Sequence, residues 1–168
     1  MFHRMTGGRA LLAGLAFLCW SVMPVVAACP GAGARLIVEG DGTVIDTESG
    51  LMWKRCVQGK SGAHCSEGKA ETFRWVEALN ETRSEAFARF DGWRLPKIEE
   101  LQSLVESCLA GPAIDPIAFP NAAATEIWSA SANLDYATDA MALDFAAGEP
   151  VVGSRDDAKQ VRLVRIRP

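Results

Sequence analysis

The sequence predicts a single domain of mixed strands and helices, with short strands near both ends of the chain and two helical segments between them. Period-two alternation marks the strands, and two stripes of apolar residues spaced three or four apart mark the helices. The length of 168 residues suits one domain. Apolar residues make up 49% of the chain and charged residues 23%, which excludes a disordered or low-complexity protein.

The start of the chain has the layout of a secretory signal peptide. Two arginines precede an uncharged, mostly apolar run over residues 10–20, and small residues at 26–28 suit a cleavage site. A serine and a proline interrupt the run before it reaches the ~20 apolar residues that a transmembrane helix needs. We therefore expect residues 1–28 to be removed and residues 29–168 to form a mature domain in the periplasm or outside the cell.

The predicted mature domain is acidic. Removal of the signal lowers the count of Lys and Arg from 17 to 15 against 21 Asp and Glu, so the net charge changes from −4 to −6. Such a charge gives no general attraction to nucleic acid or to anionic polymers and lipids. We therefore expect no nucleic-acid partner.

Four cysteines remain after removal of the signal, and an even number in an exported protein indicates two disulfides. Counting leaves three pairings open. The glycine-containing turn between Cys56 and Cys65 favours a bridge there, which leaves Cys29 and Cys108 to each other. Residues 26–29 also resemble a bacterial lipobox, so lipidation of Cys29 is the alternative. The cysteine and histidine spacing does not suit zinc.

The chain after Cys29 begins as an antiparallel meander. Asp-Gly and Ser-Gly turns separate three β-rich runs. The runs cover residues 35–38, 43–46 and 51–55. An acidic stretch at 39–46 could suggest a calcium loop, but it has few suitably placed ligands, and a hairpin turn is the better interpretation.

Two helices are expected next. The first covers about residues 67–83, with one apolar stripe and glutamates on the wetter side; the stripe is Thr72, Trp75, Val76 and Leu79. A turn at 90–93 would direct Trp93 inward. The second helix would start at Leu95-Pro96, with its stripe at Ile98, Leu101, Leu104 and Val105. Cys108 would then lie on the same face as Leu101, toward the core.

The remaining third of the chain is expected to be a loop followed by strands. Prolines exclude regular structure over residues 113–121, where Ile114 and Phe119 would hold the loop to the core. Strands are expected at 126–131, 140–145 and 161–166, with a bulge or two-sided burial in the last.

Aromatic and aliphatic residues in these elements could form a core or, for the tryptophans, a platform on which sugars stack. Each tryptophan lies in a strand, stripe or turn that points inward, so we expect a structural core. Its members are Trp53, Trp75, Trp93, Leu95, Leu101 and Trp128.

At this point the motifs resemble those of the Lcl C-terminal domain family, a bacterial domain of unknown function named for the tail of a collagen-like adhesin. The matching segments are 40–46, 49–56, 91–101, 108, 114–115, 119–121, 128–131 and 161–165. The resemblance implies an α+β, C-type-lectin-like fold with two helices packed on small antiparallel sheets, similar to that of formylglycine-generating sulfatase modifiers. Family members often carry a cysteine just after the signal, which supports Cys29 as a disulfide partner.

The resemblance implies an exported, non-catalytic binding or adhesion module of the bacterial cell envelope, whose partner is an envelope or extracellular glycan or protein. The alternative is an envelope lipoprotein anchored through Cys29, which is the one case in which we expect a membrane partner. A calcium-bridged sugar site is not supported, because Glu149-Pro150-Val151 lacks the asparagine of such lectins. The adhesin's association with sulfated glycosaminoglycans does not suit a charge of −6.

Catalysis is not expected. Sulfatase modifiers use two cysteines late in the chain, and here no cysteine follows Cys108. His64 has no serine nucleophile nearby with which to form an acid–base pair. We therefore predict no catalytic residue, no metal ligand and no cofactor.

Overall fold

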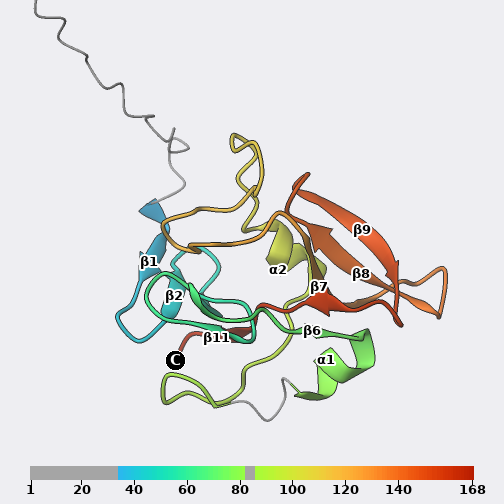
Figure 1. Cartoon of the computed structure of the whole chain (residues 1–168), viewed down its shortest axis with the longest axis horizontal. Helices are drawn as coiled ribbons and strands as arrows, with labels where there is room; N and C mark the ends of the chain where they lie inside the picture. The colour runs from blue at the N-terminus through green and yellow to red at the C-terminus, as the bar shows by residue number, and fades with distance from the viewer. Residues whose placement is uncertain (1–33, 82–85) are drawn as a thin grey trace, which may run out of the picture.

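The first three strands form an antiparallel sheet that the last strand of the chain completes. In the computed structural model, which describes residues 34–81 and 86–168, the order of this sheet is β1-β2-β3-β11 (Figure 1). The strands are β1 (Leu36–Val38), β2 (Thr43–Asp46), β3 (Leu51–Lys54) and β11 (Val164–Ile166). The predicted meander is confirmed. Residues 1–28, predicted to be a signal peptide, and Cys29 lie outside the described residues.

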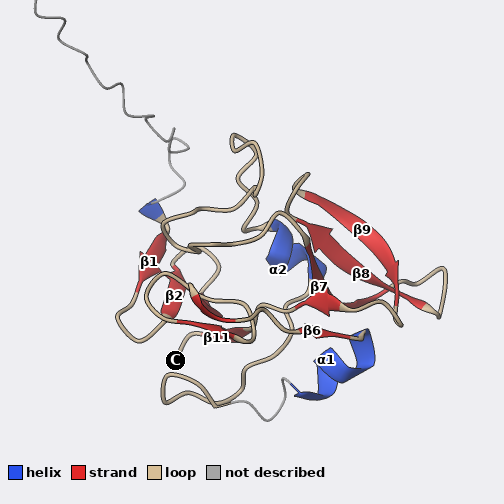
Figure 2. Cartoon of the chain, in the orientation of Figure 1, coloured by secondary structure: helices blue, strands red, loops and turns tan. Residues whose placement is uncertain are grey.

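A second sheet of five strands has the order β6-β10-β7-β8-β9. Its strands are β6 (Thr72–Phe73), β7 (Glu126–Ala132), β8 (Asp139–Asp144), β9 (Glu149–Ser154) and β10 (Lys159–Gln160). β10 runs parallel to β7, with Gln160 beside Ile127, so the expectation of purely antiparallel sheets is wrong. A small hairpin of β4 (Lys60–Ser61) and β5 (Glu67–Gly68) completes the strands (Figure 2). The α+β class is confirmed.

The first helix is shorter than predicted. α1 covers Trp75–Glu81, whereas the expected helix began at residue 67. Gly68 of β5 has φ 74° and pairs with Lys60 of β4 in the small hairpin, and Thr72 pairs with the distant Gln160. Strand pairing therefore takes these residues out of the helix. The buried face also differs, because Trp75 is buried whereas Val76 is 54% exposed.

The second helix, α2 (Ile98–Gln102), begins after the proline that was expected to start it. The carbonyl of Pro96 accepts the N–H of Ala130 in β7 (2.7 Å), and the Glu100 carboxylate accepts the N–H of Lys97 (2.7 Å). The Ser103 hydroxyl ends the helix by donating to the carbonyl of Glu100 (2.8 Å).

Because α2 ends early, Cys108 does not share its apolar face. Cys108 is exposed, so the expectation that it faces the core is wrong. Leu101 and Leu104 are nevertheless buried. The turn expected at residues 90–93 lies instead between Phe87 and Phe90, with both intervening residues at positive φ.

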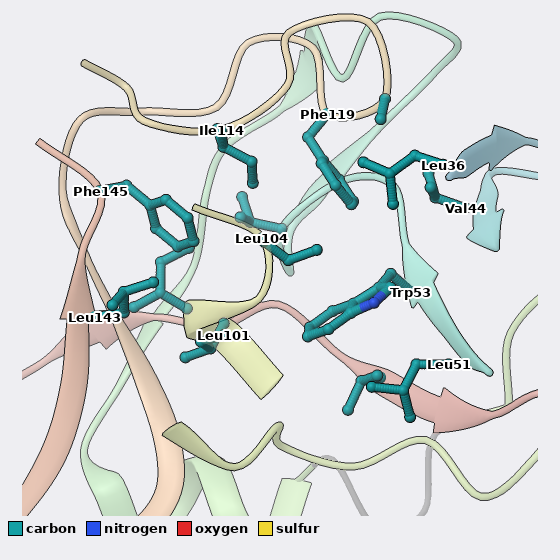
Figure 3. Packing of buried hydrophobic residues seen from close by; sticks show 14 of the residues in the cluster. Leu36, Val44, Leu51, Trp53, Leu101, Leu104, Ile114, Phe119, Leu143 and Phe145 are labelled. Atoms are coloured by element: carbon teal, nitrogen blue, oxygen red, sulfur yellow. The ribbon is translucent and has the colours of Figure 1, made fainter. Parts of the chain in front are cut away.

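The core fills the space between the two sheets and α2 (Figure 3). Ile114 and Phe119 are fully buried and hold the proline-rich loop to it, as predicted. The strand expected at residues 161–166 is shorter in the structure, because β11 covers only Val164–Ile166. Residues 161–163 are buried but lie outside any strand, so the slip in alternation marks the end of a buried connecting segment. No helix among the described residues is long and apolar enough to cross a bilayer.

Candidate binding site

The tryptophans are core residues rather than a surface for sugar stacking. Trp53, Trp93 and Trp128 are at most 1% exposed, and Trp75 is 8% exposed. The indole N–H of Trp75 donates to the carbonyl of Ser129 (2.8 Å), which fixes α1 against β7. Leu95 and Leu101 are also buried, so all six residues predicted for the core lie in it.

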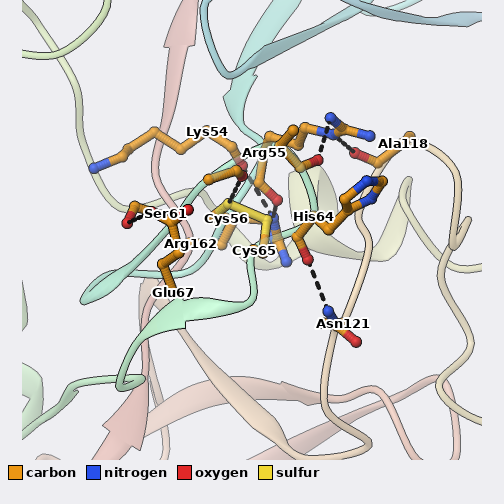
Figure 4. The surroundings of a disulfide bond; sticks show 12 residues. Lys54, Arg55, Cys56, Ser61, His64, Cys65, Glu67, Ala118, Asn121 and Arg162 are labelled. Carbon is orange, nitrogen blue, oxygen red and sulfur yellow. Dashed lines mark hydrogen bonds between the residues drawn. A yellow bond between two sulfur atoms is a disulfide. The ribbon is translucent and has the colours of Figure 1, made fainter.

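A disulfide joins Cys56 to Cys65, as the turn between them predicted, and both residues are buried (Figure 4). The Arg55 guanidinium donates to three carbonyls around this turn, those of Ala63, Ile117 and Ala118. These bonds fasten the disulfide turn to the proline-rich loop, and the geometry is that of a structural brace.

Cys108 is disulfide-bonded, and its partner lies outside the described residues. The predicted pairing with Cys29 therefore stays a prediction.

Arg162 is a buried cation that the sequence did not single out. Its Nη1 donates to the carbonyls of Lys54 (3.0 Å) and Arg55 (Figure 4). Its guanidinium lies 4.5 Å from the Phe119 ring centre. Burial lowers its pKa to about 9, so the side chain remains charged at neutral pH. Its Nε has no partner among the described residues. Arg162 thus ties the end of β3 to the final segment of the chain.

A polar hollow of about 390 Å³ lies where β7 and β10 begin and β8 ends; we call it the sheet-end hollow. Its polar lining residues are Thr72, Thr125, Glu126, Asp144, Lys159 and Gln160. They come from four strands and the segment that leads into β7. β8 pairs with β7 and β6 pairs with β10, and the parallel pairing of β10 with β7 joins these two pairs.

Lys159 is the best fixed of these groups. Its ammonium forms ion pairs with Glu126 and Asp157 and lies 4.8 Å from the Trp128 ring centre, and its side chain is 11% exposed. Gly153 makes this position possible, because a Cβ there would lie 2.6 Å from Lys159 Cε. The ammonium is therefore held in place before any ligand arrives.

The sheet-end hollow presents hydrogen-bond donors and acceptors side by side. Lys159 and Gln160 offer N–H donors, whereas Glu126 and Asp144 offer carboxylate oxygens. With two carboxylates and one ammonium in the lining, the local charge opposes an anionic ligand. A molecule that carries several hydroxyl groups can both donate to and accept from such a lining.

The sequence analysis missed every polar residue of this hollow. No local spacing links Thr72, Glu126 and Lys159, which are far apart in the chain. The sequence held one signal of this site. The polar segment 154–159 comes just before the buried run 161–164, so its charged side chains lie where the chain enters the core.

A second hollow, of about 480 Å³, lies between the β1–β2 turn, Phe87 and the disulfide turn. Its polar groups are largely engaged within the protein. The Asp41 carboxylate accepts the N–H and hydroxyl of Thr43, and the Lys54 ammonium binds Gln58 and lies over the Phe87 ring. The exposed lining of this hollow is also mainly apolar, whereas that of the sheet-end hollow is mainly polar, so this hollow is a weaker candidate for a polar ligand.

The comparisons with known proteins agree with the motifs. No curated protein matches the chain. The family model of the Lcl C-terminal domain matches residues 42–165, which include β2 and β3 of the meander, both helices and most of the last strand. The chain therefore belongs to the Lcl C-terminal domain family.

Proposed function

We propose that this protein is an exported, non-catalytic binding module of the bacterial cell envelope, and that it binds a neutral, hydroxyl-rich glycan in the sheet-end hollow. The observation that carries the proposal is the pairing of fixed donors with carboxylate acceptors around Lys159 in that hollow. A C-type-lectin-like arrangement of the α+β fold is part of the same proposal.

The volume and lining of the hollow support a ligand of sugar size. Binding pockets for small molecules typically enclose about 300–1,000 Å³, and this one has about 390 Å³. Because Trp128 is fully buried beneath Lys159, the ligand would bind through hydrogen bonds rather than by stacking. We therefore expect weak affinity and a preference for neutral over sulfated sugars.

The bonding of the cysteines and the surroundings of His64 support a non-catalytic role. Cys56 and Cys65 are joined in a buried disulfide, and Cys108 is also disulfide-bonded, so none of them is a free thiol nucleophile. His64 is exposed in the disulfide turn and has no serine, aspartate or glutamate side chain among its described hydrogen-bond partners.

Export is supported by the disulfides, which persist in oxidising compartments. The lipoprotein alternative needs a free thiol at Cys29. If Cys29 is the partner of Cys108, that thiol is already used. Mass spectrometry of the mature N-terminus separates the two, because a diacylglyceryl group on Cys29 would support the anchor and oppose the disulfide.

The experiment that tests glycan binding is a screen of neutral and sulfated envelope and extracellular glycans on the mature protein, followed by titration of the best binder. Glu126→Gln and Asp144→Asn keep the shape of each side chain but remove its charge. Asp156→Asn is the matched control, because Asp156 is exposed in the β9–β10 loop and does not line the hollow. We expect both hollow variants to weaken binding and the control to leave it unchanged. Binding that all three variants retain would contradict the proposal.

A further inference from the structure

An apolar surface lies at the opposite end of the β7–β8 hairpin from the sheet-end hollow. Glu126 at the start of β7 and Asp144 at the end of β8 face the sheet-end hollow, whereas residues 133–138 connect the two strands at the other end. Figure 1 shows this connection as the orange loop that projects from the hairpin.

This loop holds two large side chains in solvent. Leu134 is 97% exposed and Tyr136 is 66% exposed. Single exposed apolar residues are common on protein surfaces, but two in one short loop beside a hollow indicate an interaction site. Tyrosine is also one of the residues that most often dominates the binding energy of protein interfaces.

The loop is held in shape by its own hydrogen bonds. The N–H of Asp135 donates to the Asn133 side chain (3.0 Å), and the N–H of Asp139 donates to the carbonyl of Tyr136 (3.0 Å). The N–H of Arg155 donates to the carbonyl of Thr138 (2.9 Å). A loop that is ordered before binding loses less conformational entropy when a partner docks.

A hollow of about 510 Å³ lies beside the loop, between it and α2. Ile98, Ala132, Leu134 and Met141 supply its apolar lining. Val152 of β9 lies opposite Met141 in the sheet and is 54% exposed, so it extends the same apolar face. The surface thus has the apolar centre that a docked side chain requires.

Two acidic side chains flank this apolar centre. Glu99 lines the hollow and Asp135 lies in the loop, and neither carboxylate has an ion-pair partner among residues 34–81 and 86–168. Arg155, whose backbone binds the loop, has its guanidinium over the Trp75 ring (4.3 Å). Among the residues that line this hollow and the residues of the loop, the charged side chains are the acidic Glu99 and Asp135.

We propose that this surface docks a segment of a partner protein in which an apolar side chain is flanked by lysine or arginine. The apolar side chain fills the hollow beside Leu134, and the basic residues pair with Glu99 and Asp135. The site is separate from the sheet-end hollow, so it does not depend on the proposed glycan binding.

The test is a nuclear magnetic resonance titration of the mature protein with a short capped peptide that alternates lysine and leucine, compared with one that alternates glutamate and leucine. We expect saturable shifts at residues 98–99, 131–136 and 141 with the basic peptide, and no saturation with the acidic one. Glu99→Gln with Asp135→Asn should weaken binding by roughly two- to tenfold. Leu134→Ala should weaken it by about fivefold or more, whereas Ile117→Ala, at an exposed aliphatic residue in another loop, should not change it.

Three results would overturn the proposal. The first is the absence of saturable shifts at these residues, and the second is equal binding of both peptides. The third is a concentration-dependent dimer in sedimentation that Leu134→Ala abolishes, because it would assign the surface to a second copy of the chain. The amide spectrum of each variant shows whether it is folded, so loss of binding is not confused with loss of structure.

Discussion

Replacement of Gly153 by alanine should release Lys159 from the ring of Trp128. A Cβ at this position would lie 2.6 Å from Lys159 Cε and 3.1 Å from Trp128 Cη2. The buried indole cannot easily move, so the flexible end of the lysine must. The ammonium then leaves the Trp128 face and its ion pair with Glu126.

The size of the effect follows from the contacts that are lost. A largely desolvated cation–π contact contributes up to about 2 kcal/mol, and a partly exposed ion pair contributes about 0–1 kcal/mol. Alanine is more favourable than glycine in a strand by about 0.5–1 kcal/mol, and this gain offsets part of the loss. We therefore expect Gly153→Ala to lower the free energy of unfolding by about 1–2 kcal/mol.

Urea unfolding of a double-mutant cycle measures this directly. In the Lys159→Ala background no Cε is present to be displaced, so Gly153→Ala should cost much less than it does in the wild type. An equal cost in both backgrounds would refute the reasoning, because the loss would then come from Trp128 or from the strand itself. Gly153→Ala should also weaken glycan binding, since the fixed donor of the hollow is lost.

Three other predictions concern stability. Trp93→Ala should cost about 3–5 kcal/mol in denaturant unfolding, because it removes a buried aromatic ring; an unchanged midpoint would contradict the assignment of Trp93 to the core. Cys29→Ser should lower the melting temperature more than Cys56→Ser, because the expected long bridge restricts more of the unfolded chain, and non-reducing peptide mapping checks the pairing. Burial raises the pKa of Glu100, but hydrogen bonds from Arg94 and the Lys97 N–H outweigh it and hold the pKa below its ordinary value. The stabilisation by Glu100 is therefore complete above its unfolded-state pKa and is lost as the pH falls through the lower folded-state pKa. Glu100→Gln should flatten the acid side of a plot of melting temperature against pH, and an unaltered slope would count against this pair.

The sequence predicted elements well where local signals decide the structure. The first hairpin is an example: β2 covers Thr43–Asp46 as expected, because a turn at Gly42 precedes it and a turn at Gly50 follows it. The disulfide between Cys56 and Cys65 is another, since the turn between them brings the two residues together.

Long-range pairing explains the elements that were predicted wrongly. Thr72 fits a helical stripe with Trp75, but the backbone of Thr72 pairs with Gln160, far along the chain. The expectation for Cys108 failed because it required α2 to continue, whereas Ser103 ends that helix five residues earlier.

The candidate site could not be predicted for the same reason. Asp144 lies opposite Glu126 in the antiparallel β7–β8 pair, and Lys159 joins them because β10 pairs in parallel with β7. A parallel pair between distant segments leaves no local pattern in the sequence. The strand predicted at residues 161–166 included Arg162, which in the structure precedes β11. Its burial follows from the packing of that segment between β3 and Phe119, which alternation alone does not indicate.

The most direct test of the central proposal is calorimetric titration of the mature protein with the best neutral glycan from the screen, repeated with Asp144→Asn and Asp156→Asn. The account predicts that Asp144→Asn weakens binding by about five- to thirtyfold, because it removes a charged acceptor worth about 1–2 kcal/mol from the hollow. Asp156→Asn should bind as the wild type does. Equal affinity for all three proteins, or tighter binding of the sulfated form of the same glycan, would contradict the assignment of the sheet-end hollow as the binding site.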